Sequence, residues 1–451
     1  MYRFRKIDNL FKFNELENQE IYFSDISSLN DPMEGYRQYF WQGDTILWKN
    51  FLKHYLLCFH NMLILAYLDG DINPDNIPVF MSEEHLPTDE LRKVFRRICE
   101  RFFHYDGISD YLHMLSNRSQ KVKIGLDEIV VHLKLLHMLA FKVILTIHSE
   151  EKLRPPLPTD FYEIKTHINE LAVAWAELDA VSVQEQEELI YVVNKILEEL
   201  SLMLFVEYDD FKIQFILNRF PYEYINQIKK LVYPETYVAC FSEDCTNAVL
   251  WAHYADGHKG VCLKFRSTEH DGKQFIELNN KHGWQKFEFH KVNYVNDLRQ
   301  FVAIDFFKSL GRLTYKQLMS QWYTDEEGNQ SQFSSHLNNI EEWRKHHWRD
   351  YEEGFLKKLK DWEYEKERRL ILCDLLNDHI NTEDRKFKYK FEDLEAIIFG
   401  AKTPFEDKKK IIEIIEAKCR ANNRSEFDFY QADFSSVSGT MKINKLSFIT
   451  F

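Results

Sequence analysis

The segment LWAHYADGHKGVCLKF, residues 250–265, carries the strongest fold signal in the chain. Helix-like spacing over Ala248–Tyr254 runs into a glycine-containing turn, and Val261–Phe265 follows as a strand. A second segment, IYFS at 21–24 followed by LNDPME at 29–34, also joins an apolar strand to a polar turn. Because rigid scaffolds display recognition groups on such turns, we predict one site built from both ends of the chain.

Working outward from these segments, the pattern predicts two lobes. Apolar residues recur three and four apart between residues 45 and 232, as in Leu91–Phe103 and Glu187–Phe205, which predicts an α-helical lobe. Residues 1–44 and 233–451 read as an α+β domain, with a further helical segment at about 295–361. Its expected elements are a helix at Asn9–Glu17, strands at Thr236–Phe241, Phe275–Leu278, His290–Tyr294, Leu394–Phe399 and Phe427–Tyr430, helix Pro404–Ala421, and terminal strands in Met441–Phe451. We therefore expect a mixed β-sheet core formed from both termini, with the helical lobe inserted into it.

The composition argues against loose binding to phosphate polymers or anionic lipid. The chain has 451 residues and 58 Lys and Arg against 72 Asp and Glu, a net charge of −14. Two basic clusters, at 357–360 and 408–410, alternate with acidic neighbours and are interpreted as solvated helix faces.

The N-terminal residues contain no long apolar centre of a secretory signal, which predicts a cytoplasmic protein. The apolar stretch Leu56–Leu68 is too short to span a bilayer, and Val131–Ile147 carries histidines and lysines. Both are expected to be buried helices, with no membrane partner.

The seven cysteines form no CxxC pair, and their odd number favours a reducing compartment. Cys240, Cys245, His253, His258 and Cys262 lie close enough in sequence to raise the question of zinc. Their spacing matches no common ligand pattern, so we predict no metal site.

Several of these segments resemble a bacterial family, the domain of unknown function 2971 family (DUF2971). The resemblance rests on Tyr2-Arg3, Tyr22–Glu34, Cys240–Phe265, Trp362–Arg369 and Ile397–Gly400. It covers roughly the first forty and the last two hundred residues, and it does not cover the helical lobe.

The order of these motifs is similar to that of ADP-ribosyltransferase-like folds: an aromatic-Arg first strand, a helix, a strand ending in aromatic and hydroxyl residues, and a late strand with glutamate. That resemblance implies NAD, as substrate, in a cleft between two small sheets. It also implies a toxin or antiphage defence role.

Cleavage of the nicotinamide–ribose bond builds positive charge on the ribose, so a catalyst needs a carboxylate near that ring. If residues 364–370 form an extended strand, Glu365, Glu367 and Arg369 lie on one face of it. We predict Glu367 as the main catalytic residue with Glu365 beside it, and Arg369 as a cofactor-binding residue. The alternative reading is a charged amphipathic helix.

Other side chains have chemistry that suits the same ligand. Arg3 could grip the pyrophosphate or the carboxamide, aromatic rings could stack on nicotinamide, and His253 could act as an acid or base. Each type also has an ordinary structural explanation in a core, a turn or a chain end. The remaining predicted cofactor-binding residues are Tyr2, Tyr22, Phe23, Ser24, Asn30, Asp31, Trp251 and Tyr254, and Glu34 could also face the cleft.

We therefore predict an NAD-dependent ADP-ribosyltransferase-like effector that modifies a macromolecule, with a partner or trigger bound by the helical lobe. The alternatives are an NAD glycohydrolase and a non-enzymatic module that senses a nucleotide or partner. A nuclease-like or RNA-modifying toxin is disfavoured by the net charge. The prediction requires Arg3, Tyr22 and Glu367 to converge on one dinucleotide-sized hollow.

Overall fold

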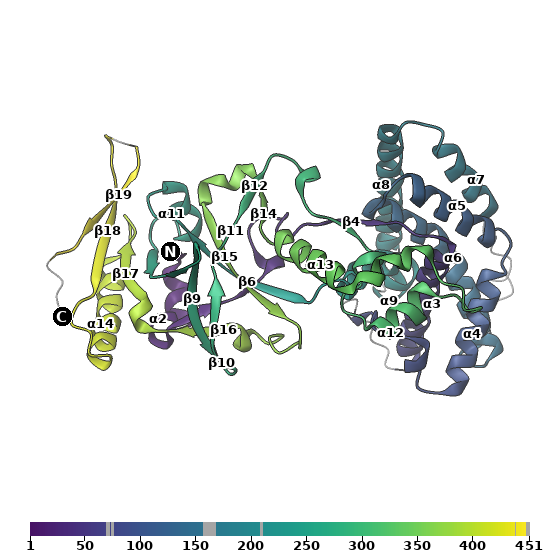
Figure 1. The fold of residues 1–451 in the computed structure, drawn as a ribbon, viewed down its shortest axis with the longest axis horizontal. Helices are drawn as coiled ribbons and strands as arrows, with labels where there is room; N and C mark the ends of the chain where they lie inside the picture. The colour runs from purple at the N-terminus through teal and green to yellow at the C-terminus, as the bar shows by residue number, and fades with distance from the viewer. Residues whose placement is uncertain (69–72, 74–75, 157–167, 208–210, 438, 448–451) are drawn as a thin grey trace. The chain divides into compact units, whose positions relative to one another are not determined.

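A computed structural model describes residues 1–68, 73, 76–156, 168–207, 211–437 and 439–447 (Figure 1). The fold mixes α-helices and β-strands, as expected, and the chain divides into two compact units. The first, the α+β unit, comprises Met1–Tyr36, Pro234–Val302 and Glu352–Phe451. The second, the helical unit, comprises Arg37–Tyr233 and Ala303–Tyr351.

The larger sheet of the α+β unit has the strand order β11-β15-β6-β1-β7-β17-β18-β19, and β3 also pairs with β6. Strand β1 lies between β6 and β7 and is antiparallel to both, so the N-terminal strand is placed among strands from the last half of the chain. The bounds are β1 Tyr2–Arg5, β3 Ser24–Asp25, β6 Glu235–Ser242, β7 Val261–Phe265, β11 His290–Lys291, β15 Glu367–Asp374, β17 Leu394–Phe399, β18 Asp428–Phe434 and β19 Met441–Lys445.

A second sheet has the order β10-β9-β16-β2, with β8 paired to β9. Apolar side chains of both sheets form one buried cluster, in which Phe265 of the first sheet makes an edge contact with Tyr389 of the second at 5.0 Å between ring centroids. Burial of these aromatic rings is the main force that holds the sheets together. The bounds are β2 Glu20–Tyr22, β8 Thr268–His270, β9 Lys273–Asn280, β10 Gly283–Glu288 and β16 Lys386–Tyr389.

Short-range sequence patterns locate many of these elements. The predicted helix at 248–254 is α11 (Ala248–Tyr254), which begins where the Asn247 side chain accepts a hydrogen bond from the Val249 amide. The predicted strands at 261–265 and 394–399 coincide with β7 and β17, and α14 (Phe405–Ala421) lies at the predicted helix. The strand predicted within 441–451 is β19, but residues 448–451 lie outside the described part of the chain.

Two predicted elements are divided in the structure. The helix expected at 9–17 consists of α1 (Ile7–Lys12) and α2 (Glu15–Asn18), because Asn14 between them adopts a left-handed backbone with φ of 50°. The strand expected at 290–294 is split into β11 and β12 (Asn293–Val295). Strand β12 pairs in parallel with β14 (Lys357–Leu359) and not with the strand beside β11.

The helical unit contains the helices predicted at 91–103 and 187–205, as parts of α4 and α8. Helices α3 and α6 contribute many of its buried apolar side chains. The bounds are α3 Thr45–Leu68, α4 Asp89–Phe103, α5 Ile108–Lys121, α6 Leu126–Glu150, α7 Ile168–Leu178, α8 Val183–Glu207, α9 Phe211–Gln214, α10 Phe220–Ile228, α12 Tyr315–Leu318 and α13 Ile340–Gly354.

The segment Ala303–Tyr351 lies in the helical unit, whereas the sequence pattern assigns the helical stretch at about 295–361 to the α+β domain. The cause is a small sheet in which β13 (Ala303–Asp305) pairs in parallel with β4 (Gln38–Trp41), which also pairs with β5 (Ile124–Gly125). Pairing between residues so far apart leaves no periodic signal in the local sequence.

Helices α3 and α6 are long and apolar enough to cross a membrane by length and composition. In each, the most apolar 18-residue window is mostly buried inside the protein, 61% for α3 and 67% for α6. These helices include the stretches that the sequence analysis interpreted as buried core.

The turn between α11 and β7 is packed tightly at one glycine. A Cβ atom on Gly260 would lie 2.3 Å from the Arg5 carbonyl oxygen and 2.9 Å from the Ala255 Cα atom. We expect Gly260→Ala to lower the free energy of unfolding by roughly 1–3 kcal/mol, because backbone atoms must move. Urea unfolding followed by circular dichroism measures this difference.

The control is Gly257→Asn in the same turn. Gly257 has φ of 58°, which Asn tolerates better than other residues, and a Cβ atom added there would meet nothing within 4 Å. Equal losses of stability in the two variants would show that close packing at Gly260 is not the cause.

Candidate functional site

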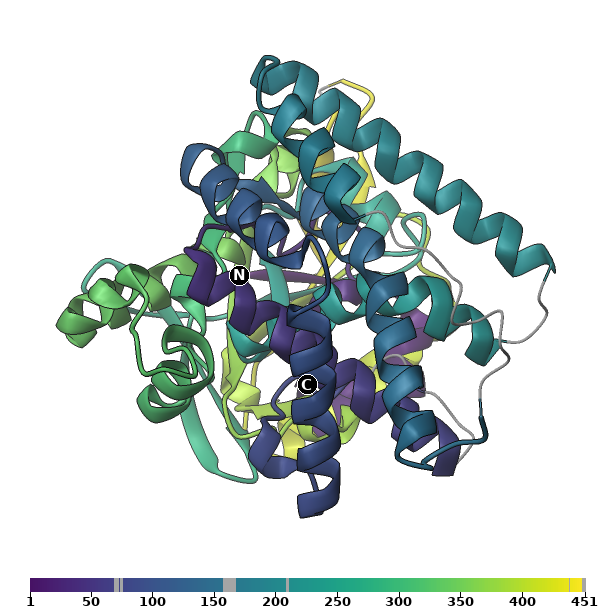
Figure 2. The same cartoon turned by 90° about the vertical axis from the view of Figure 1, so that its right-hand side faces the viewer.

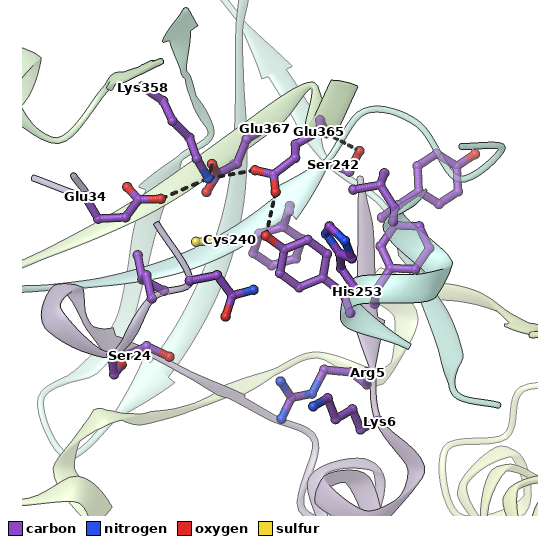
Figure 3. A pocket seen from close by; sticks show the side chains of 18 of the residues that line it. Arg5, Lys6, Ser24, Glu34, Cys240, Ser242, His253, Lys358, Glu365 and Glu367 are labelled. Carbon is purple, nitrogen blue, oxygen red and sulfur yellow. Dashed lines mark hydrogen bonds and ion pairs between the residues drawn. The ribbon is translucent and has the colours of Figure 1, made fainter. Parts of the chain in front are cut away.

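A pocket of about 340 Å³ lies in the α+β unit, where β1, the loop after β3, β6, α11 and the start of β15 meet (Figure 3). Three kinds of side chain line it. They are the aromatic rings of Tyr2, Phe4 and Tyr254, the carboxylates of Glu34, Glu365 and Glu367, and the cations of Arg5, Lys6 and Lys358. Its volume is within the usual range of small-molecule sites.

A change of backbone conformation at Lys366 directs the side chains of Glu365 and Glu367 into the pocket. A 3-10 helix, Lys360–Glu365, ends at Lys366, whose left-handed backbone with φ of 44° turns the chain into β15. The Ser242 hydroxyl donates to the Glu365 carbonyl oxygen at 2.7 Å and fixes this turn against β6. The predicted extended face therefore begins at Glu367, and Glu365 reaches the same pocket from a different local structure.

The carboxylates belong to a buried charge cluster formed by Glu34, Glu365, Glu367, Lys358 and Arg369. The Lys358 Nζ atom lies 2.9 Å from Glu34 Oε1, 2.8 Å from Glu365 Oε2 and 3.5 Å from Glu367 Oε2. Arg369 donates to both oxygens of Glu367 at 2.8 Å, and its Nη2 atom lies 2.7 Å from Glu34 Oε2. All five side chains are at most 6% exposed, so the charges are compensated mainly by one another.

The surroundings shift the pKa values of Glu365 and Glu367 in opposite directions. Burial opposes ionisation of Glu367, but the charge and hydrogen bonds of Arg369, with Lys358, lower its pKa to about 2. Burial raises the pKa of Glu365, and the nearby Glu367 charge raises it further against the opposing effect of Lys358. Adjacent carboxyl groups with separated proton affinities are suited to different catalytic roles.

Helix α11 places two side chains beside these glutamates. The Tyr254 hydroxyl donates to Glu365 Oε1 at 2.5 Å, and burial together with Glu365 raises the pKa of Tyr254. His253 lines the pocket with an exposed side chain, and its Nδ1 atom lies 3.3 Å from the Tyr364 hydroxyl. The exposed imidazole is not part of the buried charge cluster.

The opposite side of the pocket is basic. Arg5 and Lys6 lie across the pocket from the labelled glutamates (Figure 3). Arg5 forms an ion pair with Glu15, in which its Nε donates to Oε2 at 2.7 Å and its Nη2 donates to Oε1. Lys6 is exposed. The pocket therefore has a carboxylate wall and a basic wall.

Seven of the thirteen predicted catalytic and cofactor-binding residues line this pocket: Tyr2, Ser24, Asn30, His253, Tyr254, Glu365 and Glu367. Glu34, which was also expected to face the cleft, lines it as well. The other six predicted residues do not line it, and most of their side chains pack or form hydrogen bonds inside the fold. Arg369 acts behind the pocket by clamping Glu367, and Asp31 accepts the Met33 amide in its own turn. The six are Arg3, Tyr22, Phe23, Asp31, Trp251 and Arg369.

Arg3, Tyr22 and Glu367 were expected to converge on one hollow. Of these three residues, only Glu367 lines the pocket. Along β1, Tyr2 and Phe4 line the pocket, whereas Arg3 lies on the opposite face of the strand. Arg5 reaches the pocket from the last position of the strand. The buried Arg3 donates to the Tyr22 carbonyl oxygen at 2.9 Å and lies over the Phe241 ring.

Two further predicted residues belong to the core near the site. Phe23 is fully buried against Phe387. Trp251 is also fully buried; its ring meets Phe4 edge to face at 5.1 Å, and its Nε1 donates to the Cys245 carbonyl oxygen. The contribution of Trp251 is to position β1 and α11, which carry pocket side chains.

Sequence reasoning missed the role of Lys358 and assigned no role to Arg5, Lys6 or Cys240. The interpretation of the 357–360 cluster as a solvated helix face is wrong for Lys358, which lies on strand β14 with its side chain 3% exposed. The sequence Lys-Lys-Leu-Lys is compatible with a strand. Because buried lysines are uncommon, however, the pattern favoured the prediction that these side chains are exposed to solvent.

Within the described residues, no group of three or more His, Cys, Asp or Glu side chains is arranged to hold a metal ion. In the charge cluster the space among the carboxylates is taken by the Lys358 ammonium group. All seven cysteines are free thiols, and Cys240 lines the pocket near Glu367.

Comparison with known proteins identifies one similarity. Residues 250–370 match the family model described as Protein of unknown function (DUF2971). The matched segment contains residues 250–254 of α11, strand β7 and the Glu365–Glu367 turn. Six of the residues that line the pocket belong to it: Leu250, His253, Tyr254, Lys358, Glu365 and Glu367. The search of curated proteins and the search of solved structures gave no match.

The opposed pKa shifts generate a test by pH. Because the pKa of Glu367 is lowered on folding, its charge stabilises the fold above the ordinary value of 4.5, and this contribution is lost as pH falls towards 2. We expect Glu367→Gln to lower the free energy of unfolding at pH 7 by a few kcal/mol, on the order of other broken buried ion pairs. The difference from the wild type should shrink as pH falls from 5 to 2.

The matched control is Glu365→Gln. Because the pKa of Glu365 is raised on folding, its interactions favour the protonated form, and the associated stabilisation is lost as pH rises through the folded pKa. We therefore expect Glu365→Gln to cost less stability at pH 7 than Glu367→Gln. A larger loss from Glu365→Gln would contradict the assigned charge states.

Proposed function

We propose that the chain is an NAD-consuming enzyme of ADP-ribosyltransferase type. The observation that carries the proposal is the division of one pocket into a carboxylate wall and a basic wall. Aromatic side chains also line this pocket. NAD has the matching charge pattern, because its nicotinamide ring is cationic and its pyrophosphate is anionic. The pocket is large enough for the nicotinamide riboside half, with the remainder directed towards Arg5 and Lys6.

In the proposed reaction, the bond between nicotinamide and C1 of the ribose breaks, and the bonding electron pair leaves with nicotinamide. Positive charge then develops on the ribose ring, and the ionised Glu367 stabilises it electrostatically. Glu365 accepts the proton of the attacking nucleophile, a role that suits its raised pKa and its hydrogen bond from Tyr254. The new bond joins C1 to the acceptor or to water.

The arrangement of elements supports the same proposal. An aromatic-Arg strand, β1, is followed by α1 and by the strands β2 and β3, and a late strand, β15, begins at a glutamate. Strands β1 and β15 both pair with β6, so both reach the pocket from one sheet. This order is the one expected for an ADP-ribosyltransferase-like fold, and Tyr2, Phe4 and Tyr254 supply the rings available for stacking.

The first test is turnover of NAD by Glu367→Gln. The substitution preserves size and removes the charge that stabilises the ribosyl cation, so nicotinamide release should fall roughly 100-fold or more. Release is measured by chromatography with purified protein, NAD and cell lysate. The control is Glu363→Gln, an exposed glutamate of the 3-10 helix that precedes β15, which should leave the rate unchanged.

Mass spectrometry of the same reactions separates the possible outcomes. An ADP-ribose adduct on a macromolecule identifies a transferase, and NAD loss without an adduct identifies a glycohydrolase. Saturable binding of NAD that stays intact would replace the enzyme by a sensing module. Neither binding nor cleavage would reject NAD as the ligand.

A second test concerns the basic wall. Lys6 is exposed at the pocket edge, so Lys6→Ala should not disturb the fold. Loss of its attraction to the pyrophosphate should raise KM for NAD roughly two- to tenfold with little change in kcat. An unchanged KM would show that the phosphates do not lie along this wall.

A further inference from the structure

Helix α8 of the helical unit presents an apolar stripe to solvent, formed by Leu189, Val192, Val193, Ile196, Leu200 and Met203. Their side chains are between 39% and 68% exposed. Figure 2 shows α8 as the long teal helix whose one end leads into a grey trace. Single exposed apolar residues are common on protein surfaces, but a contiguous stripe of this kind marks an interaction site.

A neighbouring face of α8 is anchored within the helical unit, which fixes the direction of the stripe. Gln186 and Ile190 are buried, and the Gln186 side-chain oxygen accepts a hydrogen bond from Arg118 at 3.0 Å. One turn further, the Asn194 amide donates to Asp127 at 3.4 Å. The stripe therefore cannot turn inward without breaking these contacts.

The spacing along the stripe is that of a helix-pairing seam. Leu189, Val193, Ile196, Leu200 and Met203 follow one another at alternating intervals of four and three residues. This repeat is the one that allows apolar side chains of two helices to interlock over several turns. A second amphipathic helix is thus the shape of partner that the stripe fits.

The negative charge of α8 indicates which kind of helical partner fits the stripe. The helix carries six glutamates and one lysine, and Glu199 borders the stripe at the position that faces the flank of a paired helix. A second copy of α8 would bring glutamates against glutamates, and an anionic bilayer would repel the same side chains. Lys195 is already paired with Glu198 at 2.7 Å.

We propose that α8 is the docking surface for a partner protein that supplies an amphipathic helix with a leucine-type stripe and lysine or arginine flanks. The apolar stripe provides the buried area, and the acidic edge that includes Glu199 attracts the basic partner. This proposal does not depend on NAD chemistry in the α+β unit.

The test uses the full chain and two synthetic helical peptides with leucine at the seam positions. One peptide has lysine at the flanking positions, and the other has glutamate there. Fluorescence anisotropy of labelled peptides should show roughly tenfold or tighter binding of the lysine peptide. Ile196→Asp should weaken that binding by roughly tenfold or more, because it places a charge in the seam.

Two variants serve as controls. Leu202→Asp changes an exposed leucine of α8 that lies away from the stripe, and it should leave binding unchanged. The double variant Glu188→Lys/Glu199→Lys should reverse the preference, so that the glutamate peptide binds more tightly. All substituted side chains are exposed, and thermal unfolding checks that the fold is retained.

Three results would overturn the proposal. The first is equal binding of both peptides by the wild type, or equal effects of Ile196→Asp and Leu202→Asp. The second is a concentration-dependent dimer in ultracentrifugation that Ile196→Asp abolishes, which would identify a second copy as the occupant. The third is Ile196-dependent binding to phosphatidylserine vesicles, which would identify a lipid surface.

Discussion

The pairing of Lys358 and Arg369 with three buried glutamates is the constraint on which the α+β unit depends. Charges removed from water are tolerated only when they are compensated, and here each carboxylate contacts at least one cation at 2.9 Å or less. The cluster joins the loop that follows β3, the short strand β14 and the start of β15. Loss of either cation would leave excess negative charge buried at the floor of the pocket.

The same cluster gives the pocket its chemistry. Arg369 holds Glu367 by two hydrogen bonds and keeps it ionised, whereas Glu365 has Lys358 and Tyr254 as partners and favours a proton more strongly. Two carboxyl groups separated by one residue thus acquire different properties from their surroundings. Arg5 and Lys6 add the opposite charge at the other side of the pocket, and this polarity is the basis of the NAD proposal.

The helical unit is organised differently. Its polar interior contacts, such as those of Arg118, hold helices in register, and its helix α8 carries an exposed apolar stripe with acidic flanks. Such a surface is energetically unfavourable in an isolated chain, because its apolar side chains are exposed to water. The chain therefore combines a pocket with charged walls, for which we propose a small charged ligand, with a separate surface for which we propose a basic helical partner.

The sequence by itself determined element types wherever the evidence was local. Helix α11 and strands β7 and β17 were located from apolar spacing and turn residues, and Glu365, Glu367, His253 and Tyr254 were singled out by residue type. The tertiary structure decided which face of each strand reaches the pocket, because a shift of one residue reverses every side chain. It placed Tyr2 rather than Arg3 at the pocket, buried Lys358 among carboxylates, and assigned 303–351 to the helical unit. These outcomes depend on partners far away in the sequence, and no periodic pattern records them.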